Sequence, residues 1–87
     1  MPESGMEEVG KVAGFFAHVG AAVFELTAPL RVGDRIYIKG HTTDFQQVVE
    51  SMQFEHQPVQ EASAAQAVGV KVQQRCRQHD VVYKLVA

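Results

Sequence analysis

Cys76 and His79 come closest, by residue type and spacing, to a reactive or metal-binding site in this chain. They form a Cys-x-x-His pair, whereas a structural zinc site needs four ligands. The other histidines, His18, His41 and His56, stand apart from this pair in the sequence. We therefore predict no metal site and interpret the histidines as surface or hydrogen-bonded side chains.

The thiol of Cys76 lies between Arg75 and Arg77. Two neighbouring guanidinium groups could lower its pKa and make the thiolate reactive. No base or second cysteine lies at a spacing that would activate it, so an ordinary exposed cysteine is the preferred interpretation. His79 and Asp80 are adjacent on an extended chain, which points their side chains apart. We predict no catalytic residues and a chain that is not an enzyme.

The stretch from Gly5 to Lys11 matches the G-x-x-x-x-G-K spacing of a phosphate-binding loop. The next residue is Val12, where magnesium coordination requires Ser or Thr. We expect a strand rather than a helix to follow, so no helix N-terminus would face a phosphate. Glu7 and Glu8 would also repel an anion. We therefore predict neither nucleotide binding nor any cofactor.

A basic cluster lies in the last fifth of the sequence. Its members are Lys71, Arg75, Arg77, His79 and Lys84. The net charge of the chain is −2, so bulk charge would not drive binding to nucleic acid. The cluster is either a solvated loop and strand face or a patch that contacts phosphates with salt-sensitive affinity. In the second case Tyr83 or Phe54 could stack on a base.

Short strands separated by turns must position these residues. The chain has 87 residues, of which 46% are hydrophobic, and this length suits one domain. Residues 1–8 lack periodicity and are predicted to form a flexible tail, followed by a single β-domain over 9–87. Apolar alternation predicts strands at 9–18, 21–27, 35–39, 46–56, 68–73 and 81–85, with a bulge near Ser51 where the alternation breaks. An alternative for 61–66 is one helical turn.

The segment Leu30 to Gly40 is the most informative part of the sequence. Gly33 can adopt a positive φ, and the Asp34 carboxylate can accept hydrogen bonds from nearby backbone amides, so the two form a turn. Ile36 and Ile38 then alternate with polar residues, which gives one buried and one exposed strand face.

Together with Gly10-Lys11-Val12, Val49–Gln53 and Val68–Val72, this segment resembles the second domain of elongation factor Tu and related translational GTPases. Small stand-alone elongation factor-like proteins show the same likeness. The resemblance runs from about Val9 to Leu85. It implies an all-β fold, namely a closed six-stranded antiparallel Greek-key barrel.

The resemblance also implies a non-catalytic binding module that docks on tRNA, rRNA or a ribosome-associated protein. Two polar residues help to hold the aminoacyl end of tRNA in that family, and they correspond here to Gln53 and Ala67. We therefore expect no recognition of an aminoacyl end. A glycine-containing turn of the family is replaced by Ala65-Gln66, so we expect this turn to lack glycine geometry.

The alternative is a protein-interaction or adaptor barrel with no nucleic-acid role. Phe15 or Phe16, with Val19, would form its exposed apolar patch, because adjacent strand residues face opposite ways. One cysteine and acidic N-terminal residues predict a cytoplasmic protein. No apolar run is long enough for a transmembrane helix, and no membrane contact is expected. The partner and the oligomeric state stay open.

Overall fold

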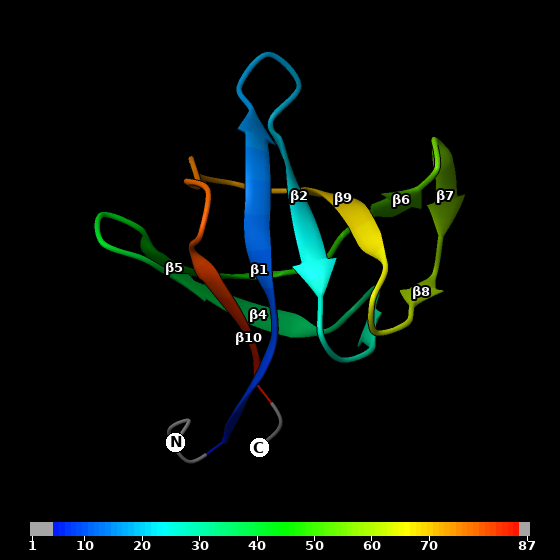
Figure 1. Ribbon diagram of the computed structural model, residues 1–87, viewed down its shortest axis with the longest axis horizontal. Coiled ribbons are helices and arrows are strands. Elements are labelled where there is room, and N and C mark those ends of the chain that lie inside the picture. Colours follow the sequence, from blue (N-terminus) through cyan, green and yellow to red (C-terminus); the bar gives the residue numbers. More distant parts are fainter. Residues whose placement is uncertain (1–4, 86–87) are drawn as a thin grey trace.

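The computed structural model describes residues 5–85, which form an all-β domain without a helix. Eight strands form one antiparallel sheet in the order β5-β4-β10-β1-β2-β9-β6-β7, and β3 pairs with β8 in a second sheet (Figure 1). The strands are β1 (Met6–Phe16), β2 (Ala21–Leu26), β3 (Leu30–Arg31), β4 (Arg35–Lys39), β5 (Asp44–Val48), β6 (Met52–Phe54), β7 (Gln57–Val59), β8 (Glu61–Ala62), β9 (Ala67–Lys71) and β10 (Val81–Leu85). The all-β prediction is confirmed.

The first strand begins earlier than the sequence predicts. Met6, Glu7 and Glu8 pair with the last three residues of β10, although we assigned them to a flexible tail. Residues 1–4 of that predicted tail lie outside the described residues. Register shifts between Glu8 and Gly10 and between Val12 and Gly14 bend β1, so that one long strand can pair with both β10 and β2.

The predicted closure into a six-stranded barrel is wrong, because the hydrogen-bonded sheet is open, with β5 at one edge and β7 at the other. The expected strand at 46–56 is divided into β5 and β6. Glu50 and Ser51 are both exposed in the link between them, so the alternation breaks at Ser51 because one strand ends and another begins, and not through the predicted bulge. β5 and β6 are joined by a link of three residues, although they lie near opposite ends of the sheet order. The sheet is therefore strongly coiled, which brings its two ends close together.

The side chain of Gln47 joins these two ends of the sheet. Its Nε2 donates to the carbonyl of Lys71 at 2.8 Å, and its Oε1 accepts from the backbone N–H of Gln73 at 2.8 Å. Gln47 is buried, so both halves of its amide are satisfied inside the protein. One carboxamide therefore replaces the strand pairing that a closed barrel would have at this position.

The core fills the inside of the coiled sheet with inward-facing residues of both sheets and of the links that follow β5 and β9. The buried hydrophobic residues are Val9, Val12, Ala22, Phe24, Leu26, Leu30, Ile36, Ile38, Phe45, Val49, Met52, Ala62, Val68, Val70, Val72, Cys76 and Val82. Burying one large aliphatic or aromatic side chain stabilises a fold by about 1.5–3 kcal/mol. Among the described residues, no helix is long and apolar enough to cross a membrane.

Three turns share one hydrogen-bonding pattern, at Arg31–Asp34, Ser63–Gln66 and Arg77–Asp80. In each, the backbone N–H of the fourth residue donates to the carbonyl of the first, at 3.1, 3.3 and 3.1 Å. In each, a side-chain oxygen of the fourth residue accepts from the backbone N–H of the first, at 2.9, 2.8 and 2.8 Å. We refer to them as the reciprocal turns.

The third residue of every reciprocal turn has a positive φ. These residues are Gly33 at 98°, Ala65 at 72° and His79 at 79°. The expectation that the Ala65-Gln66 turn would lack glycine geometry is therefore wrong, because alanine adopts that geometry here. The alternative of a helical turn at 61–66 is also wrong, since Glu61 and Ala62 form β8.

Candidate functional site

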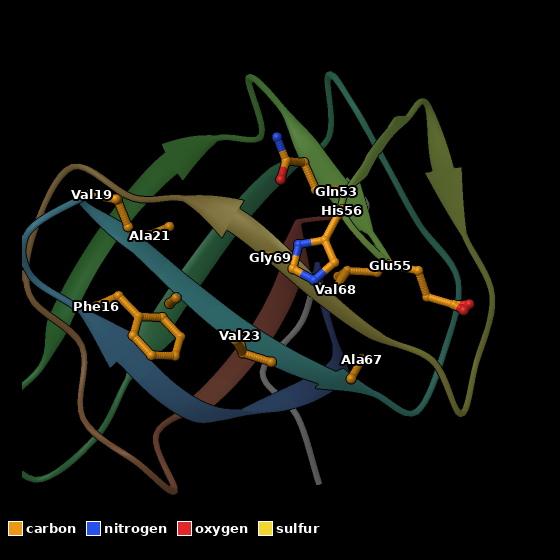
Figure 2. A pocket seen from close by; sticks show the side chains of 11 residues that line it. Phe16, Val19, Ala21, Val23, Gln53, Glu55, His56, Ala67, Val68 and Gly69 are labelled. Atoms are coloured by element: carbon orange, nitrogen blue, oxygen red, sulfur yellow. The ribbon is translucent and has the colours of Figure 1, made fainter.

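A groove of about 490 Å³ lies on the outer face of β2, β9 and β6. Such a volume is in the range of small-molecule sites. Figure 2 shows its lining residues, with Phe16 and Val19 on one side, Gln53 and His56 on the other, and Ala21, Val23, Ala67 and Gly69 between them. Most of the exposed lining is apolar. We refer to this feature as the groove.

Small side chains keep the floor of the groove low. Val23 of β2, Gly69 of β9 and Gln53 of β6 are direct neighbours across the three strands. They face outward because their neighbours Phe24, Val68 and Met52 are buried in the core. Ala21 and Ala67 extend this row of outward positions along β2 and β9.

The first wall is the hairpin between β1 and β2. Its turn is closed by the backbone N–H groups of Val19 and Gly20, which donate to the carbonyl of Phe16 at 3.2 and 2.9 Å. The side chains of Phe16 and Val19 are 49% and 59% exposed, which is unusual for large apolar residues. Phe15 instead packs against the core. Of the predicted interaction residues, Phe16 and Val19 line the groove and Phe15 does not.

The second wall is the hairpin between β6 and β7. Phe54 pairs with Gln57, so Glu55 and His56 form a two-residue turn with φ values of 52° and 67°. Turns of this kind favour Asn-Gly, since a side chain in left-handed geometry costs about 1–2 kcal/mol per residue. Glu55 and His56 carry that strain at the rim of the groove, and Figure 2 shows the His56 imidazole over β9.

The groove continues toward the end of β9 that carries Lys71. A second hollow of about 410 Å³ shares Val19, Ala21, Gln53 and Gly69 with the first, and adds Ser51 and Lys71. The two hollows therefore form one continuous depression along β9. One end has the ammonium group of Lys71. The other end has Glu55 at the rim and Glu25, which pairs with Ala67 across β2 and β9.

The structure does not bring the predicted basic cluster together. Lys71 ends β9, and Arg75, Arg77 and His79 lie exposed on the following loop. Lys84 pairs with Glu7 of β1. Lys71 pairs with Ala21, which in turn pairs with Phe16, and Phe16 is nine residues along β1 from Glu7. This separation corresponds to about 30 Å along the strand. Lys84 also contacts Asp34, with Nζ 3.4 Å from Oδ2.

The aromatic partners proposed for nucleic acid are engaged elsewhere. The rings of Tyr83 and Tyr37 stack with their centroids 6.1 Å apart. Phe54 is partly buried and packs against the core. A continuous basic and aromatic surface for nucleic acid is therefore not formed by these residues.

Cys76 is a core residue, which corrects the expectation of an exposed cysteine. It is 2% exposed, and its Sγ lies 3.7 Å from the carbonyl oxygen of Gln74. Burial and, to a smaller extent, the nearby negative charge of Asp80 together raise the pKa of the Cys76 thiol to about 11. The alternative of a reactive thiolate is therefore wrong. The arginine neighbours point into solvent and do not lower the pKa.

Within residues 5–85, no three His, Cys, Asp or Glu side chains are grouped closely enough to hold a metal ion. The groove contributes one imidazole, one carboxylate and one amide, without a nucleophile beside a base. This arrangement can bind and orient an elongated ligand, since apolar walls and a few polar groups provide contact and direction.

The residues of the second wall were missed by the sequence analysis. The segment 46–56 was predicted as one strand with a bulge near Ser51, and Glu55-His56 has neither the glycine nor the asparagine that usually marks a hairpin. The floor was missed because cross-strand register, rather than local sequence, places Val23 beside Gly69. Small or β-branched residues at alternate positions of β2 and β9 were a usable signal.

Known proteins with similar sequences are proteases. An uncharacterized protease of Methanocaldococcus jannaschii is 42% identical over 79 residues, which cover 90% of this chain and 19% of the protease. A collagenase of Porphyromonas gingivalis is 36% identical over 87% of this chain and 22% of its own length. The chain thus spans about a fifth of the curated relatives that it matches. No family model matches the sequence.

A solved structure has the same fold. It is the C-terminal domain of a candidate U32 peptidase from Geobacillus thermoleovorans, with a TM-score of 0.84 and 26% identity. The match covers 90% of this chain and 91% of that domain. The chain is similar to a U32 peptidase domain.

The U32-type similarity overturns the resemblance to elongation factor Tu. The predicted RNA-binding or translation-related module is wrong, because sequence relatives and the matched structure are proteases and a peptidase domain. The motif that carried the resemblance is a reciprocal turn followed by a strand. The part of the chain that the structure describes builds that turn three times from different residues. The motif therefore indicates local hydrogen bonding and not a family.

Proposed function

We propose that this chain is a non-catalytic accessory domain of U32-type peptidases and that the groove is its contact surface. The main support is the position of the similarity. Identity of 42% extends over 90% of this chain but over only 19% of the M. jannaschii protease, and the matched fold is a C-terminal domain. A unit that is separable from most of a protease suits an accessory role.

The chemistry of the chain supports a role without catalysis. The thiol of Cys76 is buried, and its pKa is raised to about 11, so it is protonated at neutral pH. The exposed polar groups of the groove do not form a nucleophile and base pair. We assign bond cleavage to the remaining four-fifths of such proteases and polypeptide contact to this domain.

A truncated relative tests this proposal. A U32-type peptidase lacking its matching C-terminal domain is assayed on casein and gelatin, with and without the 87-residue chain. We expect the chain alone to release no peptides, and its addition, free or fused, to raise hydrolysis by the truncated enzyme severalfold. Hydrolysis by the chain alone, or no effect on the truncated enzyme, would contradict the proposal. A heat-unfolded sample of the chain is the control.

A further inference from the structure

We propose that the groove binds an extended peptide with a basic side chain at one end and an acidic side chain about four residues away. This inference rests on the proposed function, because it names the class of polypeptide that the accessory domain would hold. It is carried by the charges at the two ends, the apolar surface between them and an unpaired stretch of β9.

The charges at the two ends of the groove have opposite signs. Lys71 lies at one end, with Ser51 and Gln53 beside it. Glu55 lies at the other end, and Glu25 is the direct neighbour of Ala67 on the outer face. Directly opposed strand residues have Cβ atoms about 5 Å apart, so the Glu25 carboxylate can reach the same end. A ligand with one positive and one negative end complements this pattern.

The distance between the ends sets the length of the ligand. Ala67 and Lys71 are four residues apart on β9, which corresponds to about 13 Å. An extended peptide covers the same distance with four residues. Between the ends, the exposed faces of Phe16, Val19 and Val23 offer apolar contact for small side chains.

The backbone of β9 offers a directional contact at Ala67. The N–H of Leu26 donates to the carbonyl of Gln66 at 2.9 Å, so Gln66 and Val68 direct their backbone groups toward β2. Ala67 and Gly69 therefore direct their backbone N–H and carbonyl groups toward β6. The pairing of β6 with β9 ends at Gln53 and Gly69, so within residues 5–85 no strand pairs with Ala67 on the side away from β2. Its N–H and carbonyl face the space that a bound peptide would occupy.

The turn at Glu55-His56 explains why β6 leaves β9 at this point. Two consecutive non-glycine residues with positive φ reverse the chain before β6 can pair with Ala67. Strain of this kind persists where the surrounding structure holds it, and it often accompanies binding sites. The strained turn therefore keeps the end of the groove open and holds Glu55 and His56 at the rim.

Titration of the ¹⁵N-labelled chain with short peptides tests the inference. The probes are acetylated, amidated Lys-Val-Ala-Val-Glu and its reverse, Glu-Val-Ala-Val-Lys. The controls replace both charged residues by glutamine, by lysine or by glutamate. We expect at least one oppositely charged peptide to bind with a dissociation constant of about 1 mM or below and to shift the amide of Ala67. Each control should bind at least about threefold more weakly, since each exposed ion pair contributes modestly.

Two matched glycine substitutions separate the groove from the rest of the face. A Cβ at Gly69 would meet nothing closer than the carbonyl oxygen of Gln53 at 4.0 Å, and a Cβ at Gly14 would meet nothing within 4 Å. Both positions therefore accept a side chain on the outer face. Gly69→Val fills the floor and should weaken peptide binding about tenfold. Gly14→Val adds the same group on β1, next to Val23 but not among the lining residues, and should change affinity less than twofold.

Charge removal provides the second set of variants. Glu55→Gln and Lys71→Gln should each weaken binding of the oppositely charged peptide about two- to fivefold, without changing binding of the glutamine peptide. Absence of binding, shifts confined to other faces, or equal affinity for all peptides would overturn the inference. If these results occur while the chain still stimulates a truncated peptidase, the accessory role stands and the peptide assignment fails.

Discussion

The reciprocal turns Arg31–Asp34 and Ser63–Gln66 have the same hydrogen bonds but different residues. In the first, glycine supplies the positive φ and a carboxylate accepts the returning N–H. In the second, alanine supplies the positive φ and a carboxamide is the acceptor. The difference shows that the reciprocal hydrogen bonds, and not glycine, define this turn. Glycine at the third position of the turn only lowers the energy of the positive φ.

The second turn has additional support from its neighbours. The N–H of Ala65 donates to the carbonyl of Leu26 at 2.8 Å, and the carbonyl of Gln66 accepts from the N–H of Leu26 at 2.9 Å. These contacts attach the turn to the end of β2, so tertiary structure compensates for an unfavourable residue. The third turn, Arg77–Asp80, is intermediate, with histidine at the positive φ and a carboxylate as acceptor.

The largest effect is expected from removing the most buried acceptor. Asp80 is 4% exposed, and its Oδ2 accepts from the N–H of Arg77 at 2.8 Å. We expect Asp80→Ala to lower the free energy of unfolding by about 2–3 kcal/mol, because this N–H loses its partner in a partly buried site. Chemical denaturation measures the change. Asp80→Asn, which keeps an acceptor oxygen, should lose less than half as much, and exposed Asp44→Ala almost nothing.

The thiol beside this turn provides a pH-dependent comparison. Because the pKa of Cys76 is raised from 9.0 to about 11 in the folded protein, the folded state favours the protonated thiol. Stability from this group is complete below pH 9 and is lost as pH rises toward 11, by about 2 kcal/mol. Cys76→Ala should remove this alkaline loss in denaturation curves between pH 8 and pH 11. An unchanged alkaline slope would contradict burial of the thiol.

Glycine matters most where the turn is least supported. Gly33 has a φ of 98°, further from the left-handed minimum than Ala65. We expect Gly33→Ala to lower the free energy of unfolding by about 1–2 kcal/mol, since an L side chain is strained there. Thermal unfolding provides the measurement. A neutral result would mean that the first turn tolerates alanine as well as the second does.

The smallest effect has the opposite sign. We expect Ala65→Gly to raise the free energy of unfolding by about 0.5 kcal/mol, because relief of the positive φ outweighs the greater freedom of glycine in the unfolded chain. The same denaturation experiment measures it. A matched Ala64→Gly substitution, where φ is not positive, should destabilise the protein instead. Destabilisation by both would show that the tertiary contacts of the second turn prefer alanine.

Sequence patterns predicted those parts of the fold that local chemistry determines. Alternation located β2, β4 and β10 within one residue, and Gly33-Asp34 marked its turn. The break in alternation near Ser51 marks the link between β5 and β6, whereas the bulge predicted there is not formed within one strand. Closure was predicted wrongly, because local patterns do not show that β5 meets the other end of the sheet through the Gln47 side chain instead of ladder pairing.

The candidate site was predicted only in part, for a physical reason. Alternation predicted only that Phe15 or Phe16 would be exposed, and the register shift between Val12 and Gly14 decides for Phe16. Exposure of Val19 follows from its place in a turn. The remainder of the groove depends on which residues β2, β9 and β6 place side by side, and one chain does not specify that register. Burial of Cys76 also depends on tertiary structure, because its two arginine neighbours suggested a solvent-exposed loop.

The amide of Gln47 has a consequence for how this fold comes apart. A single side chain links two backbone segments that elsewhere would be joined by several ladder bonds. Local openings start where few interactions must break together. Among the protected backbone amides of the domain, that of Gln73 should therefore be one of the fastest to exchange with deuterium. The β4–β5 hairpin should detach first when the domain is stretched.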